Sequence, residues 1–447
     1  MATTRRDRRD RGNRLVTLGL QDMQIAYPQR DNSVLKFHQP TVRQDAQATR
    51  IIVHARYPAL VEAFLAHKRV HGSSVELRLY GPDAQGWTWQ DQVARLVSQR
   101  PLAFVGGGDY TKLRNGTQMP GNGATEWDNV GTEADMNGNA PRNRYLTFEE
   151  YLSYDEIMLG SLLGVSSPSY FINDGNRYNN AQRNPNPSAF EPRGIIVGLV
   201  GARFERDDRM DSVHCLRPVA NPRQHPELTQ IFQDFFFQGA APGVQRDLTA
   251  AFDNAAYKAR MRITIEILLF EANRQAALAN RPAWVYIVGL GLGVWRQNAN
   301  QQSLYVQTFV EVLNSLANAD VDRIRTLDFA FITVPNAIKL ALSQAAGQRN
   351  IRNVRFGNRQ PAQHLPPGEA RHNTMLVLSY AWDGNSFPGN EYWQGSLAAS
   401  GDPAAAAMST IAELHNPIMN PDFLQRIEVL GPAPPAPAPA PAPAGGA

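Results

Sequence analysis

One stretch near the carboxyl end decides the fold: residues 376–385 read LVLSYAWDGN. Its apolar first half is typical of a buried strand, and its second half opens a polar loop that continues to Pro403. Pro403 and the alanines after it predict the first turn of a helix. An open α/β sheet usually places its chemistry at the carboxyl end of a buried strand, beside a helix N-terminus. The acids of this unit are therefore candidate catalytic residues: Asp383, Glu391 and Asp402.

A second strand and loop have the same design. Residues 284–295 read WVYIVGLGLGVW, an apolar run that enters glycines at alternate positions, and a helix is predicted at 303–317. Glycines let backbone amides approach an anion, and a helix N-terminus adds a favourable dipole. The spacing matches neither a phosphate-binding Walker loop nor a dinucleotide fingerprint. Two interpretations stay open here: a cradle for a phosphate or diphosphate, and a glycine-rich packing turn under Trp295.

The rest of the chain alternates between strand and helix patterns, which is typical of α/β architecture. The predicted strands are at 51–53, 75–80, 102–105, 194–202 and 327–334. The predicted helices are at 58–68, 87–98, 147–163, 250–278 and 335–345, with Thr147 as a cap. Residues 1–45 are polar and basic, and the Pro/Ala alternation of residues 431–447 offers nothing to bury in a core. We expect both ends to be partly disordered.

Composition narrows the classes of function. The 447 residues carry 44 Lys+Arg against 41 Asp+Glu, and this balance argues against a nucleic-acid partner on charge alone. The arginine-rich residues 5–14 are either a solvated arm or a contact for nucleic acid or a membrane surface. The single cysteine, Cys215, allows no internal disulfide. There is neither a signal-peptide core nor a membrane-spanning run, so we expect a cytoplasmic protein with no membrane partner.

Histidine patterning predicts no metal site. His67 and His71 are spaced i,i+4, as two ligands on one helix face would be, but the glutamate of a zinc-protease motif is absent. No third ligand is suggested by the spacing. We therefore predict no metal and no cofactor.

A third candidate loop reads SYFINDGNRYNN at residues 169–180. Its amides, Arg177 and two tyrosines are suited to a sugar, a phosphate or an adenine ring. The alternative is an ordinary surface turn at Asp174 and Gly175. Together the three loops suit a ligand with a diphosphate and a ribose, because amides bind phosphate and carboxylates bind hydroxyls or direct a water. Acids beside an anomeric carbon are also typical of glycosidic hydrolysis. For the acids, a helix cap at Asp402 and two solvated loop residues remain the alternative.

The three loops together resemble those of the atypical macrodomain family of MavL-type, arginine-specific ADP-ribosylhydrolases. The resemblance covers about residues 101–430 and is carried by the quoted stretches together with 389–391 and 401–403. It implies a three-layer α/β/α macrodomain-like fold that binds ADP-ribose. The reversed order of the asparagine and phosphate loops indicates a permuted or strongly divergent version. The domains expected are a basic arm at 1–45, an α/β extension at 46–100, the catalytic core at 101–430 and a tail at 431–447.

The resemblance also implies roles for individual residues. Asp383, Glu391 and Asp402 match three acidic positions of the catalytic loop, and Glu391 stands where aspartate is expected. Asn385 resembles an asparagine near the distal ribose. The remaining ligand-binding candidates are Gly289, Gly291, Leu292, Gly293, Val294, Trp295, Asn173, Asp174 and Arg177.

The expected reaction is therefore hydrolysis of the bond between ADP-ribose and a protein arginine. The expected partners are ADP-ribose and an ADP-ribosylated protein, with ubiquitin as one candidate because a bacterial family member acts on it. The alternative hypothesis is a non-catalytic module that binds ADP-ribose or a related nucleotide.

Overall fold

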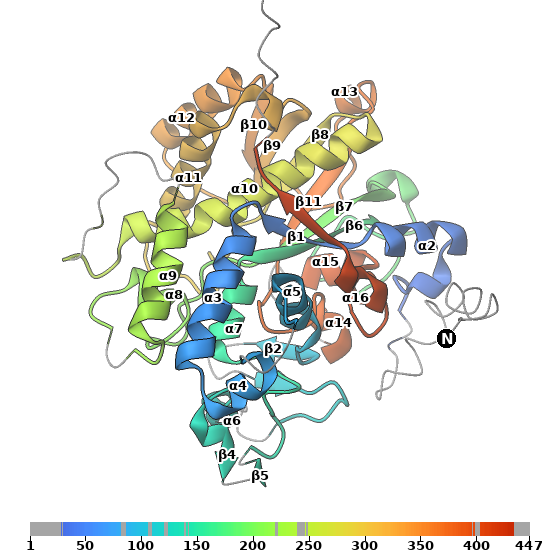
Figure 1. Ribbon diagram of the computed structural model, residues 1–447. Helices are drawn as coiled ribbons and strands as arrows, with labels where there is room; N and C mark the ends of the chain where they lie inside the picture. Colours follow the sequence, from blue (N-terminus) through green and yellow to red (C-terminus); the bar gives the residue numbers. More distant parts are fainter. Residues whose placement is uncertain are drawn as a thin grey trace, which may run out of the picture.

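The fold is built around one large sheet. The computed structural model describes residues 28, 30–81, 86–105, 110–119, 124–137, 140–141, 143–219, 222–238, 246, 249–395, 397 and 403–432. Within these residues, eight strands form the sheet (Figure 1). Their spatial order is β10 (Asn353–Gly357), β9 (Ile324–Ala330), β8 (Ala283–Ile287), β11 (Met375–Ala381), β7 (Arg193–Leu199), β6 (Leu163–Tyr170), β1 (Arg50–His54) and β12 (Ile427–Leu430).

Five neighbouring strands, from β10 to β7, are parallel. Parallel neighbours need long crossovers, and helices supply them: α10 (Asn254–Ala279) joins β7 to β8, α11 (Gln301–Ser315) joins β8 to β9, and α12 (Asn336–Gln348) joins β9 to β10. The carboxyl ends of these strands therefore lie at one edge of the sheet. β6 is antiparallel to both of its neighbours, and β1 pairs with β12 in parallel.

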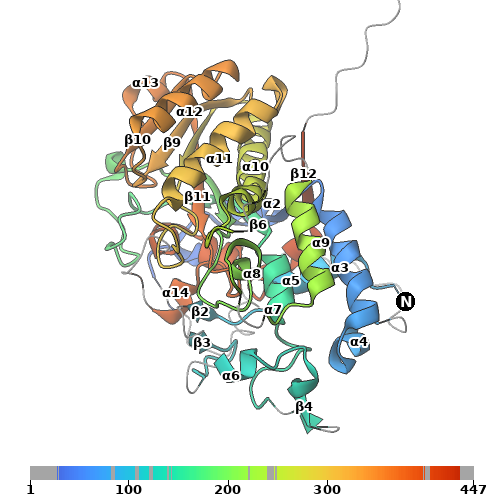
Figure 2. The same cartoon turned by 90° about the vertical axis from the view of Figure 1, so that its left-hand side faces the viewer.

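Adjacent serines of β6 show that helices cover both faces of the sheet. Ser166 donates to Glu271 of α10, while Ser167 hydrogen-bonds the ring of His415, which follows α16 (Ile411–Leu414). Successive side chains of a strand point to opposite faces, so α10 and α16 lie on opposite sides. α11 and α12 extend the α10 layer, as Figure 2 shows, and α2 (Gln39–Ala48) contacts β6. The architecture is a three-layer α/β/α fold, as the sequence predicts.

The remaining elements are short or lie at the periphery of the sheet. The helices are α3 (Tyr57–His71), α4 (Ser74–Tyr80), α5 (Trp89–Ser98), α6 (Ala124–Trp127), α7 (Tyr154–Gly160), α8 (Asp211–Cys215), α9 (Pro226–Phe237), α13 (Pro367–Ala370), α14 (Asn390–Gln394) and α15 (Pro403–Met408). Two small hairpins are β2 (Ala103–Val105) with β3 (Tyr110–Lys112), and β4 (Met136–Asn137) with β5 (Ala140–Pro141). Among the described residues, no helix is both long and apolar enough to cross a membrane.

Two predicted elements are wrong, both because a local cap overrides the apolar pattern. Residues 75–80 alternate like a strand but form helix α4, because Ser73 and Glu76 make a reciprocal capping box. The predicted helix at 147–163 shrinks to α7. Its cap is Ser153 rather than Thr147, and the residues from 163 onward are strand β6.

The amino-terminal segment takes part in the main sheet. Residues 46–100, expected to form an extension, contribute β1, which lies between β6 and β12. Part of the polar segment 1–45 is ordered as helix α2. The arginine-rich residues 5–14 and the tail from 433 onward lie outside the described residues.

Candidate active site

A cavity of about 570 Å³ lies against the centre of the sheet. Its floor is formed by Ile196 of β7 and by Leu378 and Tyr380 of β11. Ile196 and Leu378 are paired in register, and the Tyr380 hydroxyl faces the His415 ring. The cavity therefore lies on the α16 face, opposite α10. Its volume is within the usual range for a nucleotide-sized ligand, which is roughly 300–1,000 Å³.

The strand order explains why the cavity is there. β8 and β11 are adjacent, but the chain leaves β8 toward β9 and leaves β11 toward α14, α15 and α16. A crevice opens where neighbouring parallel strands send the chain in different directions, and ligands bind outside the carboxyl ends there. The loops that follow β8 and β11 both line the cavity. The sequence predicted both as site loops.

The glycine loop after β8 forms one wall of the cavity. Its lining residues include every member predicted from the sequence: Gly289, Gly291, Leu292, Gly293, Val294 and Trp295. Gly291 has a φ of +70°, and a Cβ there would lie 2.7 Å from the carbonyl oxygen of Ala202. Gly201 is equally restricted, because its Cβ would lie 2.3 Å from the Gly291 nitrogen. The loops after β7 and β8 thus pack backbone against backbone, which only glycine permits.

The same loop contains backbone amides that have no acceptor among the described residues. In the described part of the chain, the amides of Gly291, Gly293 and Val294 donate to no acceptor. α11 begins soon after the loop, and Gln302 of its first turn also lines the cavity. Unpaired amides next to a helix N-terminus form a favourable site for an anion. The glycines differ in their surroundings: Gly291 packs against Ala202 and Gly201, whereas a Cβ at Gly293 would meet open space. The anion cradle stays a prediction.

Asp383, in the loop after β11, is the acid that lines the cavity among the described residues. Its carboxylate accepts a hydrogen bond from the side-chain amide of Asn390. Burial raises the pKa of Asp383 to about 6, while the Asn390 hydrogen bond and the positive charge of Arg203 act in the opposite direction. Such a carboxyl group can take up or release a proton near neutral pH.

Glu391 lies in the first turn of α14 and does not line the cavity. Burial and the nearby charge of Asp383 raise the pKa of Glu391 to about 8. Two carboxyl groups that interact in this way titrate as a pair. Glu391 is therefore affected by the charge of Asp383 but is not part of the cavity lining.

The other predicted residues of this loop differ in their placement. Asp402 lies outside the described residues, whereas Ala405 and Met408 of α15 line the cavity. Asn385 is fully buried, and its side-chain amide has no hydrogen-bond partner among the described residues. Asn385 does not line the cavity.

The loop after β6 contributes Gly175, Asn176, Arg177 and Tyr178 to the lining of the cavity. Asn173 and Asp174 do not line the cavity. Asn173 accepts from the Gly175 amide and donates to the Gln182 carbonyl, and Asp174 accepts from the Asn176 amide. These two residues fold the loop that presents Arg177.

Sequence reasoning missed several lining residues, such as Phe331, Gln360 and Pro361. Phe331 directly follows β9, has a φ of +57° and leaves 55% of its surface exposed. The rule that ligands bind at carboxyl ends of parallel strands could have identified Phe331. Gln360 and Pro361 follow β10, a strand that the polar sequence of 346–372 hides.

Two buried arginines support the walls. Arg203 donates to Glu205 at 2.9 Å, and its guanidinium lies 4.6 Å from the Phe104 ring centre and 5.5 Å from that of Trp295. Arg100 is fully buried and donates to the carbonyl oxygen of Gly384, next to Asp383. Burial lowers the pKa of Arg100 to about 9. Arg100 lies 4.2 Å from the Trp382 ring centre, so it holds the acidic loop by carbonyl and ring contacts.

Comparison with known proteins agrees with this geometry. The family described as "ADP-ribosylhydrolase MavL-like" matches residues 26–218 and 241–429. A Drosophila melanogaster protein named ADP-ribosylarginine hydrolase CG3568 is 31% identical over 420 residues, which cover 86% of this chain and 78% of the relative. Another from the same organism, ADP-ribosylarginine hydrolase CG2909, is 29% identical over 412 residues, with the same shares covered. The chain, with its amide-lined loop after β8 and its acidic loop after β11, belongs to the MavL-like ADP-ribosylhydrolase family.

Proposed function

We propose that this protein hydrolyses the N-glycosidic bond between ADP-ribose and the side chain of a protein arginine. The observation that carries the proposal is that one cavity is lined both by the free amides of the glycine loop and by Asp383. A carboxylate alone would repel a diphosphate. The two loops therefore contact different parts of one ligand, with amides at the diphosphate and the carboxylate at the distal ribose.

The reaction needs a water, a leaving group and one proton transfer. Water attacks the anomeric carbon, the bond from that carbon to the guanidine nitrogen breaks, and the water's proton ends on the released arginine. Asp383 lines the cavity and is suited to orient and deprotonate the water. The charge of Asp383 raises the pKa of Glu391, so Glu391 is suited to hold a proton while Asp383 is ionised.

The arginine preference has a physical basis in the same loop. A guanidinium beside carboxylates gains charge-assisted hydrogen bonds. ADP-ribose linked to a serine hydroxyl or to a glutamate carboxyl offers no such cation. From the sequence resemblance we also propose Asp402 as a further acid at the ribose, and Asp402→Ala is expected to lower the release of ADP-ribose. As the substrate protein we put forward ADP-ribosylated ubiquitin, on the strength of the sequence resemblance alone.

The decisive experiment compares substrates for the wild-type protein. Free ADP-ribose is measured after incubation with protein ADP-ribosylated on arginine, on serine or on glutamate, and with ubiquitin ADP-ribosylated on arginine. We expect release from both arginine-linked substrates and little from the other two. Release from serine or glutamate at the same rate would contradict the arginine assignment. Release from other arginine-linked proteins but not from ubiquitin would contradict only the ubiquitin proposal.

Calorimetry separates this proposal from a binding module. If ADP-ribose binds and no substrate is turned over, the protein is a reader of the modification. Turnover of the arginine-linked substrate excludes that alternative.

A further inference from the structure

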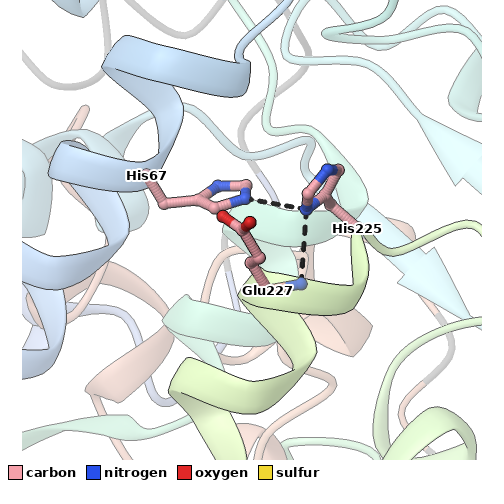
Figure 3. Close-up of side chains that lie close together, drawn as sticks. All are labelled: His67, His225 and Glu227. Atoms are coloured by element: carbon pink, nitrogen blue, oxygen red, sulfur yellow. Dashed lines mark hydrogen bonds between the residues drawn. The ribbon is translucent and has the colours of Figure 1, made fainter.

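Two histidines and a glutamate, His67, His225 and Glu227, lie close together where α3 contacts α9 (Figure 3). A third histidine, His71, stacks on both histidine rings. His67 and His71 lie on the last turns of α3, His225 precedes α9, and Glu227 lies in the first turn of α9. The ring centres of the three histidines are 4.6–4.9 Å apart. One nitrogen of His67 lies 3.1 Å from Nδ1 of His225, and Nε2 of His71 lies 2.9 Å from a carboxylate oxygen of Glu227.

We propose that His67, His71, His225 and Glu227 bind a divalent transition-metal ion, with zinc as the first candidate. Imidazole nitrogens with one carboxylate oxygen are a typical donor set for zinc, which four such ligands surround as a tetrahedron. None of the four residues lines the cavity, so this is a second site with a role of its own.

The imidazole nitrogens of the cluster lie close together. Nδ1 of His225 accepts a hydrogen bond from the Glu227 amide and lies 3.1 Å from Nε2 of His67, and a metal at this nitrogen would replace these hydrogen bonds. The His67 ring is more than nine-tenths buried, and its Nδ1 has no hydrogen-bond partner among the described residues.

The surrounding charges also favour a cation. The ligands from α3 lie at its carboxyl end, where the helix dipole stabilises positive charge. The neighbouring ammonium of Lys68 is already paired with Glu76 at 2.8 Å and Asp155 at 2.6 Å. Glu227 adds a negative charge at the cluster.

Small side-chain movements complete the geometry. The donor atoms of His67, His225 and Glu227 lie within 4.8 Å of one another, whereas ligands of a tetrahedral zinc lie roughly 3.3 Å apart. His71 and Glu227 have side chains that are 33% and 65% exposed, so both can rotate toward the ion without displacing the core. The bound metal would clamp α3 to α9, two helices that are far apart in the sequence.

The test uses the full-length protein after dialysis against a chelator. Zinc sulfate is titrated into wild type, His71→Gln, Glu227→Gln and His372→Gln by calorimetry. His372 is an exposed histidine in another part of the fold and provides the matched control. Thermal unfolding is measured with and without zinc, and cobalt is added separately to record visible absorption from a tetrahedral site.

We expect one zinc per wild-type chain and a higher Tm with zinc. Loss of a residue that only contacts a metal ligand typically weakens metal binding by about 10–100-fold. We expect a larger loss in His71→Gln and Glu227→Gln, while His372→Gln binds zinc like wild type. Absence of zinc binding in wild type would overturn the proposal. It would also be overturned if His71→Gln and Glu227→Gln bound zinc as tightly as wild type does. Unchanged circular dichroism of the exposed-site variants establishes that they are folded.

Discussion

The two loops that follow β8 and β11 border the same cavity but are built differently. The glycine loop is uncharged, and it is fixed from behind by the Gly201–Gly291 backbone contact, so its amides remain available. The acidic loop is fixed by side chains: Asn390 on Asp383, and Arg100 on the Gly384 carbonyl. Binding needs only a rigid backbone, whereas proton transfer needs a carboxyl group whose pKa is set by its neighbours. The glycine loop is therefore suited to binding the ligand, and the acidic loop to proton transfer.

The largest expected effect is that of Asp383→Asn, which keeps the shape of the side chain and removes its charge. This variant tests whether proton transfer depends on the acidic loop while binding does not. We expect kcat for ADP-ribose release to fall by about 10²–10⁴-fold, the usual contribution of a positioned acid or base, with ADP-ribose still bound. Release assays and calorimetry measure the two effects. The control is Asp322→Asn, because Asp322 is an exposed aspartate that shortly precedes β9. Activity of Asp383→Asn within tenfold of wild type would place the chemistry elsewhere.

The second comparison is within the glycine loop. Gly291→Ala forces a left-handed residue with a Cβ against the Ala202 carbonyl, so we expect a loss of about 1–3 kcal/mol in the free energy of unfolding and weaker ADP-ribose binding. Gly293→Ala meets open space and should keep wild-type stability. Urea denaturation of the two variants decides the matter. Equal stabilities would mean that the loop is not held by its backbone contact.

Glu391→Gln tests whether the ionisation of Glu391 near Asp383 lowers the stability of the folded protein as the pH rises. In the folded protein the pKa of Glu391 is raised from 4.5 to about 8, so the unfolded chain ionises first as the pH rises. The folded state therefore loses stability between these values, and the variant does not. We expect the variant to gain in unfolding free energy relative to wild type from pH 5 to pH 8. Glu62→Gln, an exposed glutamate of α3, is the control, and a pH-independent difference would contradict the pairing.

The smallest expected effect is that of Asn390→Ala. Its hydrogen bond favours the ionised form of Asp383, so its loss raises the pKa of Asp383. The acid limb of the kcat/KM profile should move to higher pH, and activity at pH 7 should fall by about tenfold or less. An unshifted acid limb would show that Asp383 does not act as the ionised group.

Much of the fold could be predicted because the central strands are continuous apolar runs. The patterns at 194–202, 284–288, 327–334 and 374–381 correspond to β7, β8, β9 and β11. β10 and β12 were missed because edge strands bury little: both are short and leave most side chains partly exposed. α4 was misread although its Ser-x-x-Glu signal was present at 73–76.

The site was predictable where it depends on the strand-to-loop rule and not where it depends on tertiary packing. Gly289–Trp295, Arg177 and Asp383 line the cavity as expected. The sequence around Asn173 does not show whether its side chain contacts a ligand or, as in the structure, hydrogen-bonds within its own loop. Similarly, no spacing rule could join His225 to His67 and His71, because the approach of α3 to α9 is a property of the whole fold.

The pairing of β1 with β12 has a consequence for how the chain is made. β1 comes first in the chain among the strands of the sheet, and its partner β12 comes last. Until β12 has been synthesised, one edge of β1 has no strand beside it and offers its backbone groups to other chains. This open edge of β1 is therefore the point where chaperone binding or aggregation should begin before β12 pairs with it.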